Sequence, residues 1–322
     1  MRKPGLIAFG LLAIVLAAAL TACGTAGRAG ERPLAVWRAV PNTTFGNSWI
    51  RALYFCGSRF LAAGDHGAMA VSADGVNWSS VDSGFGGVRV QSIASGNGVF
   101  VAVGDDGITA RSGDGTNWSR GATIHAGAQV LVVTFAEGTF VAGGTGGRIS
   151  HSADGTGWTE VDSAFGGFDV NAVAHGDGRF VAVGAGGRMA WSYDGISWNA
   201  VNETGFPGNA AINVVAHDGN GTWVAGGAAG RMAYSQDGTN WNALPNMPRV
   251  FDNRDVRRIT YGNGLFVTGG AGGVIAASAD GREWESVRYR FEDRLILSIA
   301  YGNGMFVVGG QSGRMAVAPV GE

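Results

Sequence analysis

The chain contains little cysteine, almost no lysine and no hydrophobic run of full membrane-spanning length. Cys23 and Cys56 are the two cysteines among 322 residues, so a disulfide framework is excluded if Cys23 carries another modification. Lys3 is the one lysine, and the formal net charge is −2. This balance gives no indication of a nucleic-acid partner. The apolar run over 6–20 has fifteen residues, which is short for a transmembrane helix.

The N-terminal residues have the pattern of a targeting segment. Arg2 and Lys3 supply a positive start, the apolar run follows, and it ends in Leu20-Thr21-Ala22-Cys23. This ending resembles the bacterial lipobox, which implies cleavage before Cys23 and lipidation of that cysteine. We therefore expect a signal peptide over 1–22, and a lipidated cysteine with a flexible tether over 23–33. The expected location is the bacterial cell envelope, at a membrane surface on its periplasmic or extracellular side. An ordinary secretory signal and an uncleaved anchor are the alternatives.

Glycine is abundant, with 57 residues, and a cassette recurs about every 40 residues. Such a period with strand-type patterning is typical of a β-propeller or a solenoid, because one unit cannot bury its own apolar face. Each copy contains four short strand patterns separated by glycine turns. The last copy lacks a fourth strand, whereas the segment around Trp37 has only that strand. The sequence thus predicts an all-β, seven-bladed β-propeller over 34–322, closed by pairing of its N- and C-terminal strands. The anchors of the repeat are Trp37, Trp78, Trp118, Trp158, Trp198, Trp241 and Trp284.

Six copies carry the motif Ser-x-Asp-Gly-x-x-Trp. It resembles the Asp-box repeat of sialidase-type (BNR-like) propellers, although these copies are one residue shorter than the usual family box. The resemblance covers 34–320 and implies that the aspartates accept hydrogen bonds within a turn, while the tryptophans pack between neighbouring sheets. Because the same aspartate and tryptophan recur in every copy of the motif, we expect them to have a structural role rather than a catalytic one. We assign the chain to the non-enzymatic branch of this family. The aspartates are Asp74, Asp114, Asp154, Asp194, Asp237 and Asp280.

The loops between blades differ most among the copies, so a binding function is expected there. Eight aromatic residues on these loops suggest a partner surface, and the alternative is that each packs under its own loop: Phe45, Trp49, Phe85, Phe165, Phe168, Phe206, Phe251 and Phe291. Arginine suits bidentate contact with carboxylate or phosphate. We expect a partner site near the last two blades, with an internally paired salt-bridge network as the alternative. Its residues are Arg249, Phe251, Arg254, Arg257, Arg258, Arg288, Arg290 and Arg294.

Polar residues also interrupt the first strands, at the position nearest the central channel. Arg51, Gln91, Asn171 and Asn213 are expected at the channel mouth, where either a ligand or water would satisfy them. His175 and His217 occupy first-strand ends that are aromatic in other copies, so they are expected to fill aromatic slots.

The sequence indicates no catalytic residues, no metal site and no cofactor. It contains no P-loop, nucleophile elbow or zinc signature. The predicted function is that of a monomeric, membrane-anchored lipoprotein whose propeller rim binds a protein partner, in a scaffold or assembly role. The partner is an envelope protein or an anionic glycan, and no nucleic acid is expected. The alternative is a glycan-binding lectin or a sialidase-like glycoside hydrolase, which would need an arginine triad and a tyrosine paired with a glutamate.

Overall fold

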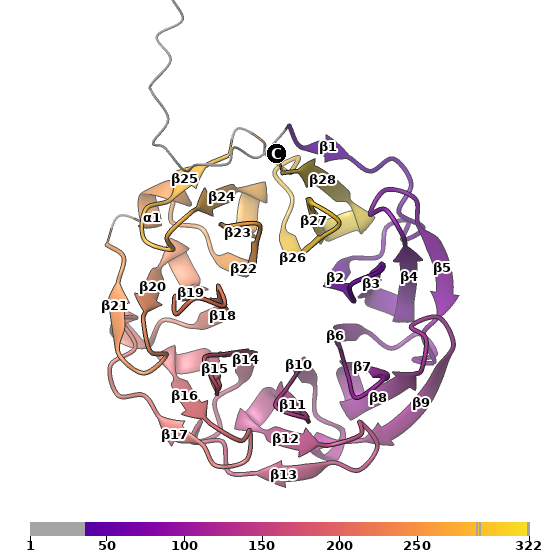
Figure 1. The fold of residues 1–322 in the computed structure, drawn as a ribbon, viewed down its shortest axis with the longest axis horizontal. Coiled ribbons are helices and arrows are strands. Elements are labelled where there is room, and N and C mark those ends of the chain that lie inside the picture. The colour runs from indigo at the N-terminus through magenta and orange to yellow at the C-terminus, as the bar shows by residue number, and fades with distance from the viewer. Residues whose placement is uncertain (1–35, 246, 288, 290, 321–322) are drawn as a thin grey trace, which may run out of the picture. The chain divides into compact units, whose positions relative to one another are not determined.

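A computed structural model describes residues 36–245, 247–287, 289 and 291–320. Within these residues, seven four-stranded antiparallel sheets form the blades of a ring (Figure 1). Six blades use four consecutive strands, and the seventh combines the two ends of the described chain. The predicted seven-bladed, all-β fold is therefore confirmed. The signal peptide, Cys23 and the tether expected over 1–33 lie outside the described residues.

The blades follow one another in chain order. Blades one to three contain β2 (Ile50–Phe55), β3 (Phe60–Gly64), β4 (Ala68–Ser72), β5 (Ser79–Asp82), β6 (Val90–Gly96), β7 (Val99–Gly104), β8 (Ile108–Ser112), β9 (Trp118–Thr123), β10 (Val130–Ala136), β11 (Thr139–Gly144), β12 (Ile149–Ser152) and β13 (Thr159–Val161). Blades four to six contain β14 (Val170–Gly176), β15 (Arg179–Gly184), β16 (Met189–Ser192), β17 (Asn199–Ala200), β18 (Ile212–His217), β19 (Trp223–Gly227), β20 (Met232–Ser235), β21 (Trp241–Ala243), β22 (Val256–Gly262), β23 (Leu265–Gly270), β24 (Ile275–Ser278) and β25 (Glu285–Ser286). Blade seven contains β26 (Ile296–Gly302), β27 (Met305–Gly310), β28 (Met315–Pro319) and β1 (Arg38–Ala39).

Short helical segments connect these strands. One α-helix, α1 (Met247–Val250), lies between blades five and six. In each blade a 3-10 turn joins the second strand to the third: Asp65–Gly67, Asp105–Gly107, Thr145–Gly147, Ala185–Gly187, Ala228–Gly230, Ala271–Gly273 and Gln311–Gly313. Two further 3-10 turns, His125–Gly127 and Pro207–Asn209, lie in loops between blades.

The ring closes by pairing the first strand with the last. β1 is antiparallel to β28, with Arg38 opposite Val317 and Ala39 opposite Ala316. Trp37, just before β1, is 4% exposed and packs in the core of blade seven. Because the two ends of the chain share one blade, the ring is continuous, and no blade lacks a neighbour on either side. The predicted pairing of the termini is confirmed.

The six Ser-x-Asp-Gly-x-x-Trp motifs form the same hydrogen-bonded turn between third and fourth strands. In the first copy, Asp74 Oδ1 accepts the backbone N–H groups of residues 76 and 77 at 2.9 and 2.8 Å, and Ser72 Oγ accepts the Gly75 N–H at 2.8 Å. The Trp78 indole N–H donates to the Gly75 carbonyl at 3.0 Å. These donors, the N–H of Asn77 foremost, hold the pKa of Asp74 well below its usual value. The aspartates are therefore occupied as parts of the turns.

Aromatic side chains pack neighbouring blades together near the first strands. His175 contacts Phe180 with ring centroids 4.8 Å apart, and His217 contacts Trp223 at 4.5 Å. Phe55, Phe135, Tyr261 and Tyr301 make the equivalent contact in other blades. The His217 ring lies against Gly176 of the preceding blade, where a Cβ would come within 2.1 Å of Nδ1. The prediction that both histidines fill aromatic slots is confirmed.

Candidate functional site

The loops between blades and the 3-10 turns between second and third strands lie at one end of the ring, because successive strands are antiparallel. We call this end the loop face and the opposite end the turn face. Six of the eight loop aromatics are buried below the loop face, and Trp49 is partly buried. Phe168, 42% exposed, is the one exposed member of the eight. The loop aromatics therefore act mainly as anchors of their own loops. The buried six are Phe45, Phe85, Phe165, Phe206, Phe251 and Phe291.

Phe251, expected to contact a partner, is one of these anchors and is fully buried. That expectation is wrong for Phe251, since its side chain packs with the core residues of blade six. The anchor nevertheless positions the residue three places later. The Arg254 N–H donates to the Phe251 carbonyl at 2.9 Å, and the Arg294 N–H donates to the Phe291 carbonyl at 2.8 Å. Arg254 and Arg294 are thus equivalent residues of two consecutive loops.

Both arginines lie over the 3-10 turn of their own blade. The Arg254 guanidinium rests on Gly272, where any side chain would collide with it. Arg294 donates from Nη1 to Ser312 Oγ at 2.9 Å. Arg249 on α1 and Arg254 are exposed, and neither forms an ion pair with another described residue. In the loop before blade six, the guanidinium groups of Arg249 and Arg254 are therefore exposed without a carboxylate partner among the described residues.

A polar groove lies beside Arg294, where blade seven meets blade one. It has a volume of about 460 Å³ and is lined by residues 40–44, 46 and 47, with Arg294, Ser312, Gly313 and Arg314. Glu292 Oε2 is 3.4 Å from Arg314 Nε and 3.9 Å from Arg294 Nε. The side chains of both ion pairs are at least one-third exposed, so each pair contributes little to the stability of the groove. Neither tyrosine nor carboxylate is among the described residues that line this groove.

The remaining members of the arginine cluster do not join this surface. Arg257 pairs through Nη2 with Asp255 Oδ2 at 2.8 Å, and Asp255 also accepts the Ala229 N–H of blade five at 3.0 Å. Arg258 lines the central channel instead of the rim. Arg257 thus follows the alternative of an internally paired salt bridge, whereas the expectation of a place at the partner site is wrong for Arg258, which lines the channel. Arg288 and Arg290 lie outside the described residues.

The central channel contains a cavity of about 150 Å³ lined by residues from all seven innermost strands. Each innermost strand has a bulge there, so one residue is skipped in the pairing with the second strand, for example Arg51 and Arg257. Of the four residues expected at the channel mouth, Arg51, Gln91 and Asn171 line the cavity. Asn213 does not: it is buried and donates to the Val256 carbonyl of the next blade at 2.9 Å. It connects two blades.

Two of the cavity-lining residues are held by acids of the loop face. Arg51 Nε lies 2.5 Å from Asp65 Oδ1, and Gln91 donates to Asp105 Oδ1 at 2.9 Å. Arg89 Nε bridges the same two acids, at 3.5 Å from Asp65 and 3.3 Å from Asp105. This chain of alternating charges at blades one and two compensates the charge of Arg51 locally.

Unlike Arg51, Arg258 has no acidic side chain beside it among the described residues that would compensate its positive charge. Its Nη1 donates to the Arg257 carbonyl at 2.8 Å, and it forms no ion pair with a described residue. Burial, followed by the charges of Arg257 and Arg51, lowers the pKa of Arg258 to about 10. Arg258 therefore remains a cation at neutral pH. Its place in the channel was not predicted from the sequence. The available signal was its position directly after the bulge, where the other six blades carry Ala52, Ser92, Val132, Ala172, Val214 and Ser298.

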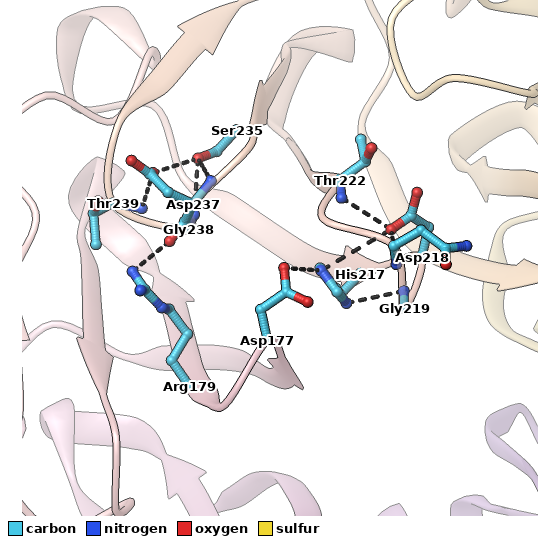
Figure 2. A network of polar contacts seen from close by, with 11 residues as sticks. Asp177, Arg179, His217, Asp218, Gly219, Thr222, Ser235, Asp237, Gly238 and Thr239 are labelled. Atoms are coloured by element: carbon cyan, nitrogen blue, oxygen red, sulfur yellow. Dashed lines mark hydrogen bonds and ion pairs between the residues drawn. The ribbon is translucent and has the colours of Figure 1, made fainter.

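The turn face carries a polar network between blades four and five (Figure 2). The Gly219 N–H donates to His217 Nδ1 at 3.0 Å, so His217 Nε2 carries the proton and donates to Asp177 Oδ2, also at 3.0 Å. Arg179 Nη1 donates to the Asp237 carbonyl in the same view. The His217–Asp177 and Arg179–Asp237 contacts join blades four and five, and the Gly219–His217 contact orients the ring within blade five. The network is structural, since its imidazole nitrogens are both engaged.

The described residues contain no group of three or more histidine, cysteine, aspartate or glutamate side chains arranged to hold a metal ion. In the same part of the chain, no helix has both the length and the apolar character to cross a membrane.

Comparison with known proteins identifies the fold. No family model and no curated protein matches the sequence. The solved structure of YCF48 bound to a D1 peptide is 18% identical, covering 89% of this chain and 97% of that chain, with a TM-score of 0.69. The WD40 β-propeller domain of Doa1 is 12% identical over 91% and 99% of the two chains, with a TM-score of 0.68. Virginiamycin B lyase from Staphylococcus aureus is 9% identical over 88% and 99%, with a TM-score of 0.76. At such identities the likeness concerns fold alone, and the chain is a seven-bladed β-propeller.

Proposed function

We propose that this protein is a lipid-anchored envelope protein whose loop face binds an acidic segment of a protein partner. The observation that carries the proposal is the placement of Arg254 and Arg294 at equivalent positions of consecutive loops, with Arg294 lining an open polar groove. Exposed guanidinium groups recognise carboxylates through paired N–H donors. YCF48, a propeller of similar fold, has been solved with a bound D1 peptide, which illustrates that such a fold accommodates a peptide.

The residues that line the groove and the channel cavity favour binding of a partner over hydrolysis of a glycan. A sialidase-like site needs a tyrosine and carboxylates that converge on arginines in one pocket. The described lining residues of the groove and of the channel cavity include neither tyrosine nor an acid. The resemblance of the turns to Asp boxes supports an architectural relationship, and the hydrogen bonds of Asp74 and its counterparts already occupy those carboxylates.

Charge reversal on the loop face should weaken binding of an acidic peptide. With a fluorescent oligoglutamate peptide as the probe, we expect the double variant Arg254→Glu, Arg294→Glu to bind at least about tenfold more weakly in anisotropy titrations. The remaining binding should also depend less on salt, since fewer charges attract the probe. The matched control is Arg120→Glu, Arg282→Glu, which places the same charges on exposed positions of β9 and of a turn before β25. Equal losses in the two double variants would contradict a site at blades six and seven.

The lipid anchor rests on Cys23 alone. In a bacterial host that lipidates such cysteines, Cys23→Ser should abolish incorporation of labelled palmitate, because the serine hydroxyl does not replace the thiolate as the acyl acceptor. Fractionation should then find the variant either unprocessed or released from the membrane. Retention of a correctly cleaved Cys23→Ser protein on the membrane would show that the anchor lies elsewhere. Cys56→Ser is the control and should label like the wild type.

A further inference from the structure

The central cavity has walls that are partly polar and partly apolar, and one cation in it has no acidic partner among the described residues. Seven residues at equivalent positions, each directly after the strand bulge, line it at one level. Six of these are alanine, serine or valine, and the seventh is Arg258. The small side chains leave room in front of a single long one. No acidic residue is among the described residues that line the cavity.

Among the arginines at the channel, Arg51 and Arg257 each have an acidic partner, whereas Arg258 has none among the described residues. Arg51 also lines the cavity, and its partner Asp65 is shared with Arg89. Arg258 has only the Arg257 carbonyl as a partner for Nη1. A guanidinium group has five N–H donors, and no nitrogen of Arg258 is both buried and without a partner, so its remaining donors are accessible from the channel. An anion would accept from several of them at once.

We infer that the channel is a binding site for a small free oxyanion, a carboxylate or a phosphate, held by the Arg258 guanidinium. Gln91 and Asn171, which line the same cavity, add polar walls beside it. A cavity of about 150 Å³ is comparable to one that accepts benzene, so it holds an anion of about six heavy atoms. The site is separate from the loop-face surface proposed for the partner. Its failure would leave that proposal intact.

Titration calorimetry of the full-length protein with inorganic phosphate and, separately, with acetate tests this inference. Ionic strength is held constant with chloride. We expect saturable one-site binding of at least one of the two anions, with a Kd of about 1 mM or tighter. Arg258→Met should weaken that binding about 10- to 100-fold. Arg258→Lys keeps the charge without the planar fork and should lose less affinity.

Arg257→Met is the matched control, because Arg257 is the adjacent residue of the same strand but does not line the cavity. Its affinity for the anion should be close to that of the wild type. Circular dichroism establishes that each variant is folded before titration. The inference is overturned if neither anion gives saturable binding to the wild type, as for a channel that holds only water. It is also overturned if Arg258→Met binds the anion as tightly as the wild type.

Discussion

Trp37→Ala should lower the free energy of unfolding by about 3–5 kcal/mol, the range found when large buried aromatic residues are truncated. Trp37 is 4% exposed and lies in the core of blade seven with Phe291 and Ile296. Its ring stacks on Tyr289, with centroids 6.0 Å apart. The loss should be large because the residue precedes the two-residue strand that closes the ring. Equilibrium denaturation in urea, followed by tryptophan fluorescence and circular dichroism, measures it.

Trp37→Phe separates packing from hydrogen bonding. The Trp37 indole N–H has no acceptor among the described residues, whereas in the six complete motifs the indole donates to a glycine carbonyl. Removing an unsatisfied N–H offsets part of the lost volume, so Trp37→Phe should cost no more than about 1 kcal/mol. An alanine variant as stable as the wild type would show that the closing strand contributes little.

His125→Phe should stabilise the protein and remove part of its sensitivity to acid. His125 is 3% exposed and has no hydrogen-bond partner for either ring nitrogen among the described residues. It occupies the anchor position that is phenylalanine in the other six loops, and its ring faces Gly144 as Phe85 faces Gly104. A phenylalanine therefore fits the slot and removes two buried polar atoms, which should add about 1 kcal/mol or more at neutral pH.

The effect should grow as the pH falls. Burial lowers the pKa of His125 from 6.5 to about 4; the charge of Glu160 raises this pKa by a smaller amount and that of Arg148 lowers it further. Because the unfolded chain takes up the proton at a higher pH than the folded protein, stability is present above about pH 6.5 and is lost as pH falls towards 4. The wild type should lose about 2 kcal/mol from this group between about pH 7 and pH 5. His125→Phe should lack that loss.

Urea denaturation at both pH values gives the comparison, and Phe85→His is its reciprocal control. That variant places a histidine in the equivalent slot of the preceding loop and should acquire the acid sensitivity that His125→Phe loses. Identical pH dependence of the wild type and His125→Phe would show that the buried imidazole does not set the acid stability.

Several features of the protein follow from the sequence alone. The number of blades, the closure by the termini and the structural role of the repeated aspartates and tryptophans were all predicted correctly. These features depend on local signals that recur at a fixed interval, such as the hydrogen bonds between Asp74 and the two residues that follow Gly75. A turn whose hydrogen bonds all lie within the motif from Ser72 to Trp78 forms in the same way wherever its sequence occurs, so periodicity is sufficient to infer it.

The division of the arginine cluster was decided by tertiary structure. Arg257 and Arg258 are adjacent in sequence, yet the first pairs with Asp255 and the second lines the channel. The bulge of β22 skips one residue in the pairing with β23, so the simple alternation of a strand does not assign the two side chains. Phe251 and Asn213 were likewise misplaced, because burial of the first and the donation by the second to Val256 depend on a neighbouring loop and blade. Sequence patterns determined the repeating frame. Packing between neighbouring blades decided which side chains line the channel, which lie on the loop face and which are buried.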